Sequence, residues 1–301
     1  MKKSLFMLGL AVAAMTSCSN DELMEVNENS FITFENHVDN GTRAETTKAG
    51  LSQFYVFGNH GTTVDFENDL VKLTDGVWNV KQVAWTGNEY QFGAYATNNA
   101  STKINNASFT SGALSFPDYQ VNQEHDLVAA LTNVDNRQLG NQAVGLTFKH
   151  MLSKVKFTIT NGSSENLTMK VSEIKFTVKN QGTCTYDNSG ITWSSLDASK
   201  ELEYAGTTSN VAKAASWTSA DNLVIPGQAL DAIKATFTVT FYNGADVFTT
   251  MNYTNVPLTL TSGSWQPGYI YNYTASPTPA MPYIQFQDDA VEGWNTTDDA
   301  L

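Results

Sequence analysis

The sequence predicts an all-β protein made of antiparallel β-sandwich domains, and three observations lead to this fold class. Several segments alternate apolar with polar residues, as strands with one buried face do, and residues 154–160 are the clearest case. Turn-forming pairs such as Asp75-Gly76 and Asn243-Gly244 separate these segments. No apolar pattern at helical spacing runs for more than about two turns. Many short strands without intervening helices favour sandwiches over a doubly wound sheet.

The expected strands divide the chain into two modules. In chain order, the strands are 54–57, 90–97, 126–132, 154–160, 174–178, 236–241, 269–274 and 283–287. The Ala-rich stretch 211–215 could form a single helical turn. A polar run at 161–166 separates two strongly alternating strands, so the expected domains are 50–162 and 163–301. Three prolines within 276–282 cannot join a central ladder and favour an extended connector.

The first residues have the pattern of a lipoprotein signal peptide, expected to span 1–17. Lys2 and Lys3 precede a short apolar run at 5–14, and small Thr16 and Ser17 stand before Cys18. This run is shorter than the roughly 20 residues that cross a bilayer. Cys18 is therefore the predicted lipidation site, and its acyl chains are the predicted membrane attachment. The alternative is a plain secretory signal with an incidental cysteine.

Composition limits the partners and the sources of stability. The chain has a formal net charge of −13 and a sequence pI of about 4.6, which argues against nucleic acid as a partner. After lipidation of Cys18, only Cys184 remains as a thiol, so no disulfide framework is expected. Cys184 is expected to be a small apolar residue in a strand. Acidic residues just after Cys18 indicate either export to the outer face or a solvated spacer.

No catalytic constellation, cofactor motif or metal motif is apparent, and we expect no enzyme. The four histidines are scattered, and residues 124–126 (Glu-His-Asp) are interpreted as a solvated strand entrance. The pairs at 288–289 and 298–299 are interpreted as solvated acidic residues. A hydrolase with a site assembled from distant carboxylates is a more remote alternative. The tryptophans at 78, 85, 193, 217 and 265 are distributed as core residues would be, and a glycan-stacking face is the alternative.

An ordered set of motifs carries a resemblance to a known family. These motifs are Cys18 after the leader, 31–34 (Phe-Ile-Thr-Phe), 42–44 (Thr-Arg-Ala), 148–155 (Phe-Lys-His-Met-Leu-Ser-Lys-Val), 223–227 (Leu-Val-Ile-Pro-Gly) and 265–271 (Trp-Gln-Pro-Gly-Tyr-Ile-Tyr). The chain resembles the fimbrillin family, the subunits of type V pili, over essentially its full length. The resemblance implies two tandem transthyretin-like antiparallel β-sandwich domains. It also implies a structural or accessory fimbrial subunit that is exposed at the cell outer membrane and supports adhesion.

The resemblance also implies how the subunit matures and assembles. Residues 18–49 would form an acidic tether and a removable first strand, which an arginine-specific protease releases by cleavage between Arg43 and Ala44. An ordinary exposed arginine is the alternative. The vacated groove would accept a strand from another pilin subunit, with 283–294 as the candidate donor. Its candidate contact residues are Tyr283, Ile284, Phe286, Val291 and Trp294, although Asp288-Asp289 and Glu292-Gly293 interrupt the alternation.

The expected partners follow from these implications. They are other pilin subunits in a head-to-tail polymer, the processing protease, the outer membrane through the lipid, and surface glycans or proteins of a host or of bacteria. Arg43 argues against an anchor subunit, and the C-terminal segment argues against a tip subunit. The alternative function from another class is a monomeric surface glycan-binding lipoprotein.

Overall fold

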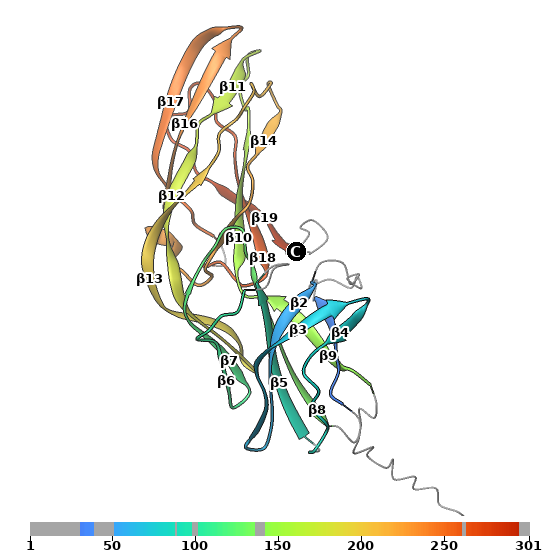
Figure 1. The fold of residues 1–301 in the computed structure, drawn as a ribbon. Helices are drawn as coiled ribbons and strands as arrows, with labels where there is room; N and C mark the ends of the chain where they lie inside the picture. Colours follow the sequence, from blue (N-terminus) through green and yellow to red (C-terminus); the bar gives the residue numbers. More distant parts are fainter. Residues whose placement is uncertain are drawn as a thin grey trace, which may run out of the picture.

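The computed structural model is an elongated, two-lobed, all-β molecule (Figure 1). It describes residues 31–38, 51–87, 89–97, 102–135, 142–260 and 263–294, with 36–38 and 288–292 described by their backbone only. The strands and one short 3-10 helix, η1 (Leu230–Ala232), are the regular elements of these residues. The predicted all-β sandwich class is confirmed. The described part contains no apolar helix of the length that a bilayer crossing requires.

The first lobe is built on one seven-stranded sheet with the order β1-β9-β8-β5-β2-β3-β4. The bounds are β1 Phe34–Val38, β2 Gln53–His60, β3 Thr63–Thr74, β4 Val77–Asn79, β5 Glu89–Thr97, β8 Leu127–Asp135 and β9 Val144–His150. Asp75 and Gly76 have φ angles of 52° and 79°, which the predicted two-residue turn between β3 and β4 requires. The strand β1 pairs with β9 in parallel, and the other pairs in this sheet are antiparallel.

The second lobe consists of a five-stranded sheet and a seven-stranded sheet. The first has the order β14-β10-β18-β19, with β15 also pairing β10. The second has the order β11-β16-β12-β7-β6, with β13 on β12 and β17 on β16. The bounds are β6 Ser108–Thr110, β7 Ala113–Gln120, β10 Ser153–Thr160, β11 Thr168–Val171, β12 Ile174–Asp187, β13 Gly190–Tyr204, β14 Ser216–Thr218, β15 Asn222–Val224, β16 Lys234–Asn243, β17 Asp246–Pro257, β18 Tyr269–Ala275 and β19 Gln287–Gly293.

The strands are not distributed between the sheets of the two lobes in simple chain order. The strand β10, expected to close the first domain, pairs with β18 and buries Val155, Phe157 and Ile159 in the core of the second lobe. The hairpin of β6 and β7 belongs to the first half of the chain but pairs with β12. The chain therefore visits the second lobe's sheet in β6 and β7, returns to the first sheet in β8 and β9, and finally leaves it between β9 and β10, about ten residues before 162. An alternating strand reveals that it has a buried face but not which sheet it joins.

Some local expectations differ from the structure. Residues 283–286 form no ladder, and the last strand instead runs from Gln287 to Gly293. The expected helical turn at 211–215 contains an isolated bridge at Val211 and a non-helical turn. The long strands β13 and β17 escaped prediction because both are largely exposed, so they lack the apolar alternation that marks a half-buried strand.

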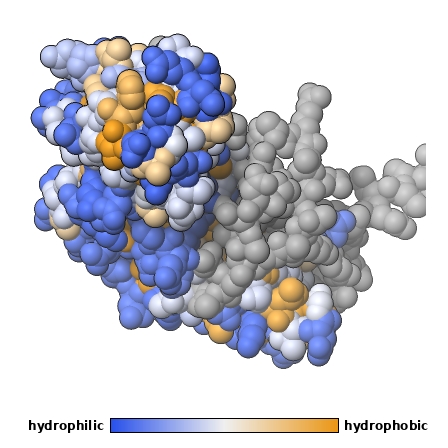
Figure 2. Space-filling view, turned by 90° about the horizontal axis from the view of Figure 1, so that it is seen from above, coloured by the Kyte–Doolittle hydropathy of each residue, from blue (hydrophilic) through white to orange (hydrophobic). Residues whose placement is uncertain are grey.

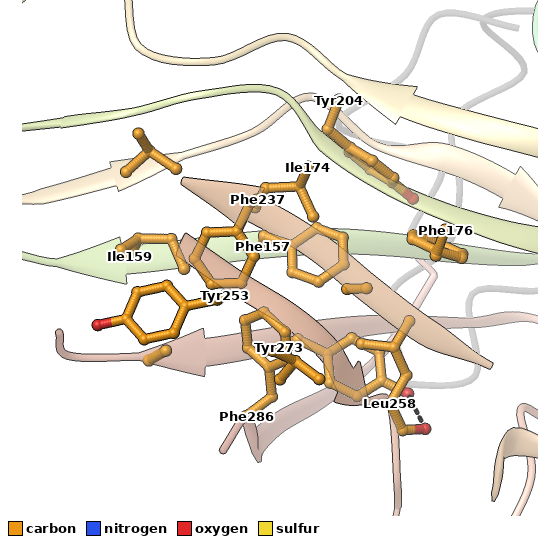
Figure 3. Packing of buried hydrophobic residues seen from close by; sticks show 14 of the residues in the cluster. Phe157, Ile159, Ile174, Phe176, Tyr204, Phe237, Tyr253, Leu258, Tyr273 and Phe286 are labelled. Carbon is orange, nitrogen blue, oxygen red and sulfur yellow. Dashed lines mark hydrogen bonds between the residues drawn. The ribbon is translucent and has the colours of Figure 1, made fainter. Parts of the chain in front are cut away.

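Three hydrophobic clusters form the core. One lies inside the first lobe, one inside the second lobe, and a third joins them through residues of β5, β7, β8, β12 and β18. In the second lobe, aromatic side chains from both sheets interdigitate around Phe157 (Figure 3). Seen from the upper end of the molecule, the surface is mostly hydrophilic, with small separate hydrophobic patches (Figure 2). Patches of this kind are ordinary on a protein surface.

Candidate functional site

The first described residues form a seam that closes the first lobe. The N–H of Ile32 donates to the carbonyl oxygen of Val83 at 2.8 Å, and Phe31 forms an isolated antiparallel bridge with Ala84. On the other side, the N–H of Val144 donates to the carbonyl oxygen of Thr33 at 2.8 Å, and β1 continues in parallel along β9. Residues 31–34 thus connect the edge strand β9 with the segment after β4. The strand β1 itself begins at Phe34, the last of these four residues.

The side chains of residues 31–34 alternate between exposed and buried, as those of a strand that lies in a groove do. Ile32 and Phe34 are 1% and 3% exposed, whereas Phe31 and Thr33 face solvent. The Phe34 ring meets the rings of Phe54, Phe66 and Phe92 edge-on, with centroids 6.2, 5.5 and 5.5 Å away. Such edge-to-face pairs add about 0.5–1.5 kcal/mol each beyond the buried area. The groove therefore has an aromatic floor that one inward-facing ring fills.

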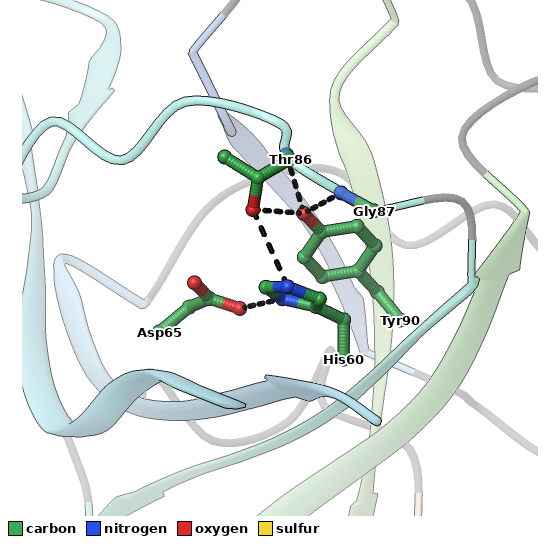
Figure 4. A network of polar contacts seen from close by, with 5 residues as sticks. All are labelled: His60, Asp65, Thr86, Gly87 and Tyr90. Carbon is green, nitrogen blue, oxygen red and sulfur yellow. Dashed lines mark hydrogen bonds and ion pairs between the residues drawn. The ribbon is translucent and has the colours of Figure 1, made fainter. Parts of the chain in front are cut away.

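A polar network holds the wall of this groove (Figure 4). The Tyr90 hydroxyl accepts hydrogen bonds from the backbone N–H groups of Thr86 and Gly87, at 2.8 and 2.9 Å. The Thr86 hydroxyl lies 3.3 Å from Nε2 of His60, whose Nδ1 lies 2.6 Å from a carboxylate oxygen of Asp65. These contacts fix the segment that carries Val83 and Ala84. Sequence reasoning missed them because the partners lie on different strands.

The order Asp65, His60, Thr86 matches the carboxylate, imidazole and hydroxyl of hydrolase triads. Such a site also needs free N–H groups near the hydroxyl to stabilise an oxyanion. Here the N–H groups of Thr86 and Gly87 both donate to Tyr90. We therefore interpret the network as structural.

The segment leading to β19 is inserted into the second lobe's own core. Ile284 and Phe286 are 8% and 7% exposed. The centroid of the Phe286 ring lies 5.2, 5.7 and 5.9 Å from those of Phe157, Phe237 and Tyr273. Figure 3 shows these rings packed together. This half of the candidate donor segment is therefore part of its own domain, and removing it would open that core.

The strand β19 continues this segment and pairs antiparallel with β18, with Val291 opposite Tyr271. Trp294 follows it and is buried, and its N–H donates to the carbonyl oxygen of Gly268 at 2.9 Å. Its ring stacks on His150 of β9 and lies under Nζ of Lys154. In this monomer, then, the candidate donor segment is docked on its own chain. Its donor role remains a prediction.

Asp126 differs from the solvated position that the sequence suggested. It is 5% exposed, and its Oδ2 lies 2.5 Å from Nδ1 of His150. Asp126 Oδ1 and His150 Nε2 have no hydrogen-bond partner among the described residues. The neighbouring sequence could not show this, because His150 lies on another strand.

The remaining sequence candidates have the following positions. Cys18, Arg43 and Ala44 lie outside the described residues. Trp85 and Trp265 are buried, and the tryptophans at 78, 193 and 217 are partly buried against the cores, so they form no common exposed face. Cys184 is buried, and burial raises the pKa of its thiol. The described residues contain no group of three or more side chains that could hold a metal ion.

Comparisons with known proteins agree with this architecture. The sequence model of the Fimbrillin-like family matches residues 42–294. A fimbrial protein from Bacteroides vulgatus is similar in structure, with a TM-score of 0.61, 15% identity, and 89% of this chain and 100% of that chain covered. A protein from Bacteroides uniformis, described as a cell adhesion protein, has a TM-score of 0.50 and 17% identity, with 88% and 99% covered. At these identities, the structural similarity shows the fold alone.

No curated protein matches the chain significantly. The family match spans most of the chain, from shortly before Arg43 to Trp294. It thus includes both lobes and β19. The chain belongs to the fimbrillin-like family.

Proposed function

We propose that this chain is a non-enzymatic structural or accessory subunit of surface fimbriae that supports adhesion. In this proposal it is exported as a lipoprotein through Cys18, and cleavage between Arg43 and Ala44 triggers its assembly. The seam at 31–34 then leaves, and a strand of another subunit takes its place. The family membership and the seam support this proposal. The seam is the single observation that carries it, because residues 31–34 bury two apolar side chains in the first lobe and bond to both neighbouring segments through their backbone.

The energetics explain why cleavage matters. Burial of Ile32 and Phe34 contributes about 3–6 kcal/mol gross, at roughly 1.5–3 kcal/mol for each side chain. Alone, this corresponds to dissociation constants from about 6 mM to about 40 μM, and the ladder between β1 and β9 strengthens the contact further. An uncut chain holds the strand at an effective concentration on the order of millimolar and keeps competitors out. After the cut, the strand is an ordinary weak ligand that a longer strand can displace.

The vacated groove suits a strand from another copy. Loss of the seam exposes the aromatic floor and leaves the β9 edge unpaired, which makes a template for strand addition. Since Ile284 and Phe286 fill the core of their own lobe, we narrow the candidate donor to β19 and Trp294, and donation would require Trp294 to leave its place against His150. A head-to-tail contact of this kind does not close on itself, so the product is a fibre.

The test is protease-triggered polymerisation of the purified precursor. Wild type, Arg43→Ala and the matched control Lys48→Ala are incubated with an arginine-specific protease, and SDS-resistant ladders are scored on gels. We expect ladders from wild type and Lys48→Ala only. Equal ladders from Arg43→Ala would refute the cleavage trigger, and cleaved wild type that stays monomeric would refute strand exchange.

Export through Cys18 has its own test. Cells that produce wild type or Cys18→Ser are fed a radiolabelled fatty acid and then fractionated. We expect only the wild-type protein to incorporate the radiolabel and to be recovered with the outer membrane, because the lipid is the proposed attachment. Membrane recovery of an unlabelled Cys18→Ser protein would contradict the lipoprotein route.

A further inference from the structure

The second lobe has a surface groove beside the segment that leads to β19. Its volume is about 660 Å³, and strands β10 and β18 and residues 281–287 line it. Small-molecule sites usually have volumes of about 300–1,000 Å³. The groove is separate from the seam at 31–34, which lies in the first lobe.

The lining combines apolar side chains with uncharged polar groups. It presents the hydroxyl groups of Thr158, Thr160 and Ser276 and the amide groups of Gln285 and Gln287. Among the described residues that line it, none is charged, although the whole chain has a formal net charge of −13. Hydroxyl and amide groups both donate and accept hydrogen bonds, so they match a ligand that carries many hydroxyl groups.

The groove also contains the most exposed large aromatic side chain of the described residues, Tyr283, which is 85% exposed. Its backbone is fixed on both sides. Ile284 follows it into the core, and the carbonyl oxygen of Met281 accepts a hydrogen bond from the Tyr253 hydroxyl at 2.9 Å. Because the backbone at Tyr283 is already fixed, a ligand that stacks on the ring has to order only its side-chain torsions.

The threonine hydroxyls on the groove floor are ordered. Thr158 Oγ1 donates to Oδ1 of Asn272 at 3.0 Å and lies 2.9 Å from Oγ1 of Thr218. Thr160 Oγ1 lies 2.7 Å from Oγ of Ser216. A hydroxyl oxygen has two lone pairs, so these side chains can accept further hydrogen bonds without breaking the existing ones.

We propose that this groove binds a neutral saccharide. The apolar face of a sugar ring would stack on Tyr283, and its hydroxyl groups would exchange hydrogen bonds with the threonine and glutamine side chains. Uronates and other acidic sugars are poor ligands, because none of the described lining residues is a cation and the chain is strongly acidic. The described lining of the groove includes no tryptophan. The proposed stacking residue is therefore Tyr283, and not the face of tryptophans that the sequence offered as an alternative.

The test uses the purified monomer with defined probes. Neutral galacto- and manno-oligosaccharides and a matched galacturonate oligosaccharide are added, and binding is measured by saturation-transfer NMR and calorimetry. We expect transfer to a neutral oligosaccharide only. Tyr283→Ala should weaken its binding about tenfold, because the stacking surface is lost. Gln285→Ala should weaken binding less, and Tyr269→Ala, a control outside the groove on β18, should bind as wild type does.

Three outcomes would overturn the inference. They are no transfer to any neutral probe, equal binding of the galacturonate, and a Tyr283→Ala variant that binds like wild type. Because the measurement needs neither cleavage nor polymers, its outcome is independent of fimbrial assembly. A chain that binds the sugar but never forms ladders would keep this inference and reject the assembly proposal.

Discussion

The indole ring of Trp294 lies flat against the imidazole ring of His150, with centroids 3.9 Å apart and planes at 9°. His150 ends β9 in the first lobe, and Trp294 follows β19 in the second. On the same indole, Nζ of Lys154 lies 4.4 Å from the ring centroid, a cation–π distance. The last described residue of the chain is therefore held at the place where the two lobes meet.

Trp294→Ala should lower the free energy of unfolding by about 3 kcal/mol, because a buried indole leaves a cavity. Amide exchange in β19 should also become faster. Urea unfolding and hydrogen exchange measure the two effects. Val247→Ala is a suitable control, since Val247 is 60% exposed and should change stability by no more than about 0.5 kcal/mol. A Trp294→Ala loss as small as that of the control would show that the stack adds no stability.

Tyr90→Phe should cost about 2 kcal/mol, because the N–H groups of Thr86 and Gly87 both lose their acceptor. The effect should reach the seam: the N–H of Ile32, bonded to Val83 on the same segment, should exchange faster. Urea unfolding and residue-resolved hydrogen exchange test this. Tyr55→Phe is the matched control, since its hydroxyl makes no hydrogen bond within the described residues. If the exchange rate of the Ile32 N–H did not change, the Tyr90 network would not stabilise the seam.

Stability should fall at alkaline pH. Burial raises the pKa of Tyr95 from 10.0 to about 12, and burial also raises the pKa of Tyr204. The unfolded chain loses the Tyr95 proton first, so the stabilising contribution is complete below pH 10.0 and disappears as pH rises toward about 12. Urea unfolding at a series of pH values measures this. The pH slope should be smaller for Tyr95→Phe; an identical slope would contradict the assignment.

Fragments 50–162 and 163–301 should not fold when they are expressed separately. The first would contain β10 without its neighbour β18, and the second would lack Phe157, around which its core is packed. Circular dichroism and amide NMR dispersion test each fragment, with the undivided chain as the reference. A fragment with dispersed spectra and a cooperative melting transition would show that the shared strands are dispensable.

The sequence was sufficient for the fold class and for most of the half-buried strands. Alternation at 154–160 and 174–178 correctly marked β10 and β12, because each has one face in a core. The same signal could not assign β10 to a lobe, since both lobes offer an apolar face. It also overlooked the exposed β13 and β17, which are formed by pairing with neighbours rather than by burial.

The candidate site could be predicted only in part from the sequence. The motif at 31–34 lies where β1 begins, and Ile284 and Phe286 are buried although the strand expected at 283–287 starts only at Gln287. The partners of these residues came from the structure, because Val83, Tyr90 and His150 are brought close only by the folded sheets. Tyr283 gave no separate signal, since a strand pattern does not reveal which aromatic side chain remains in water.

The pairing of β7 with β12 has a mechanical consequence. These strands come from opposite halves of the chain and are linked by an antiparallel ladder from Gln120–Gln181 to Leu114–Tyr186. This ladder ties the first half of the chain to the second, so a pull on the two ends must break its hydrogen bonds before the halves part. The subunit should therefore transmit tension as one stiff rod.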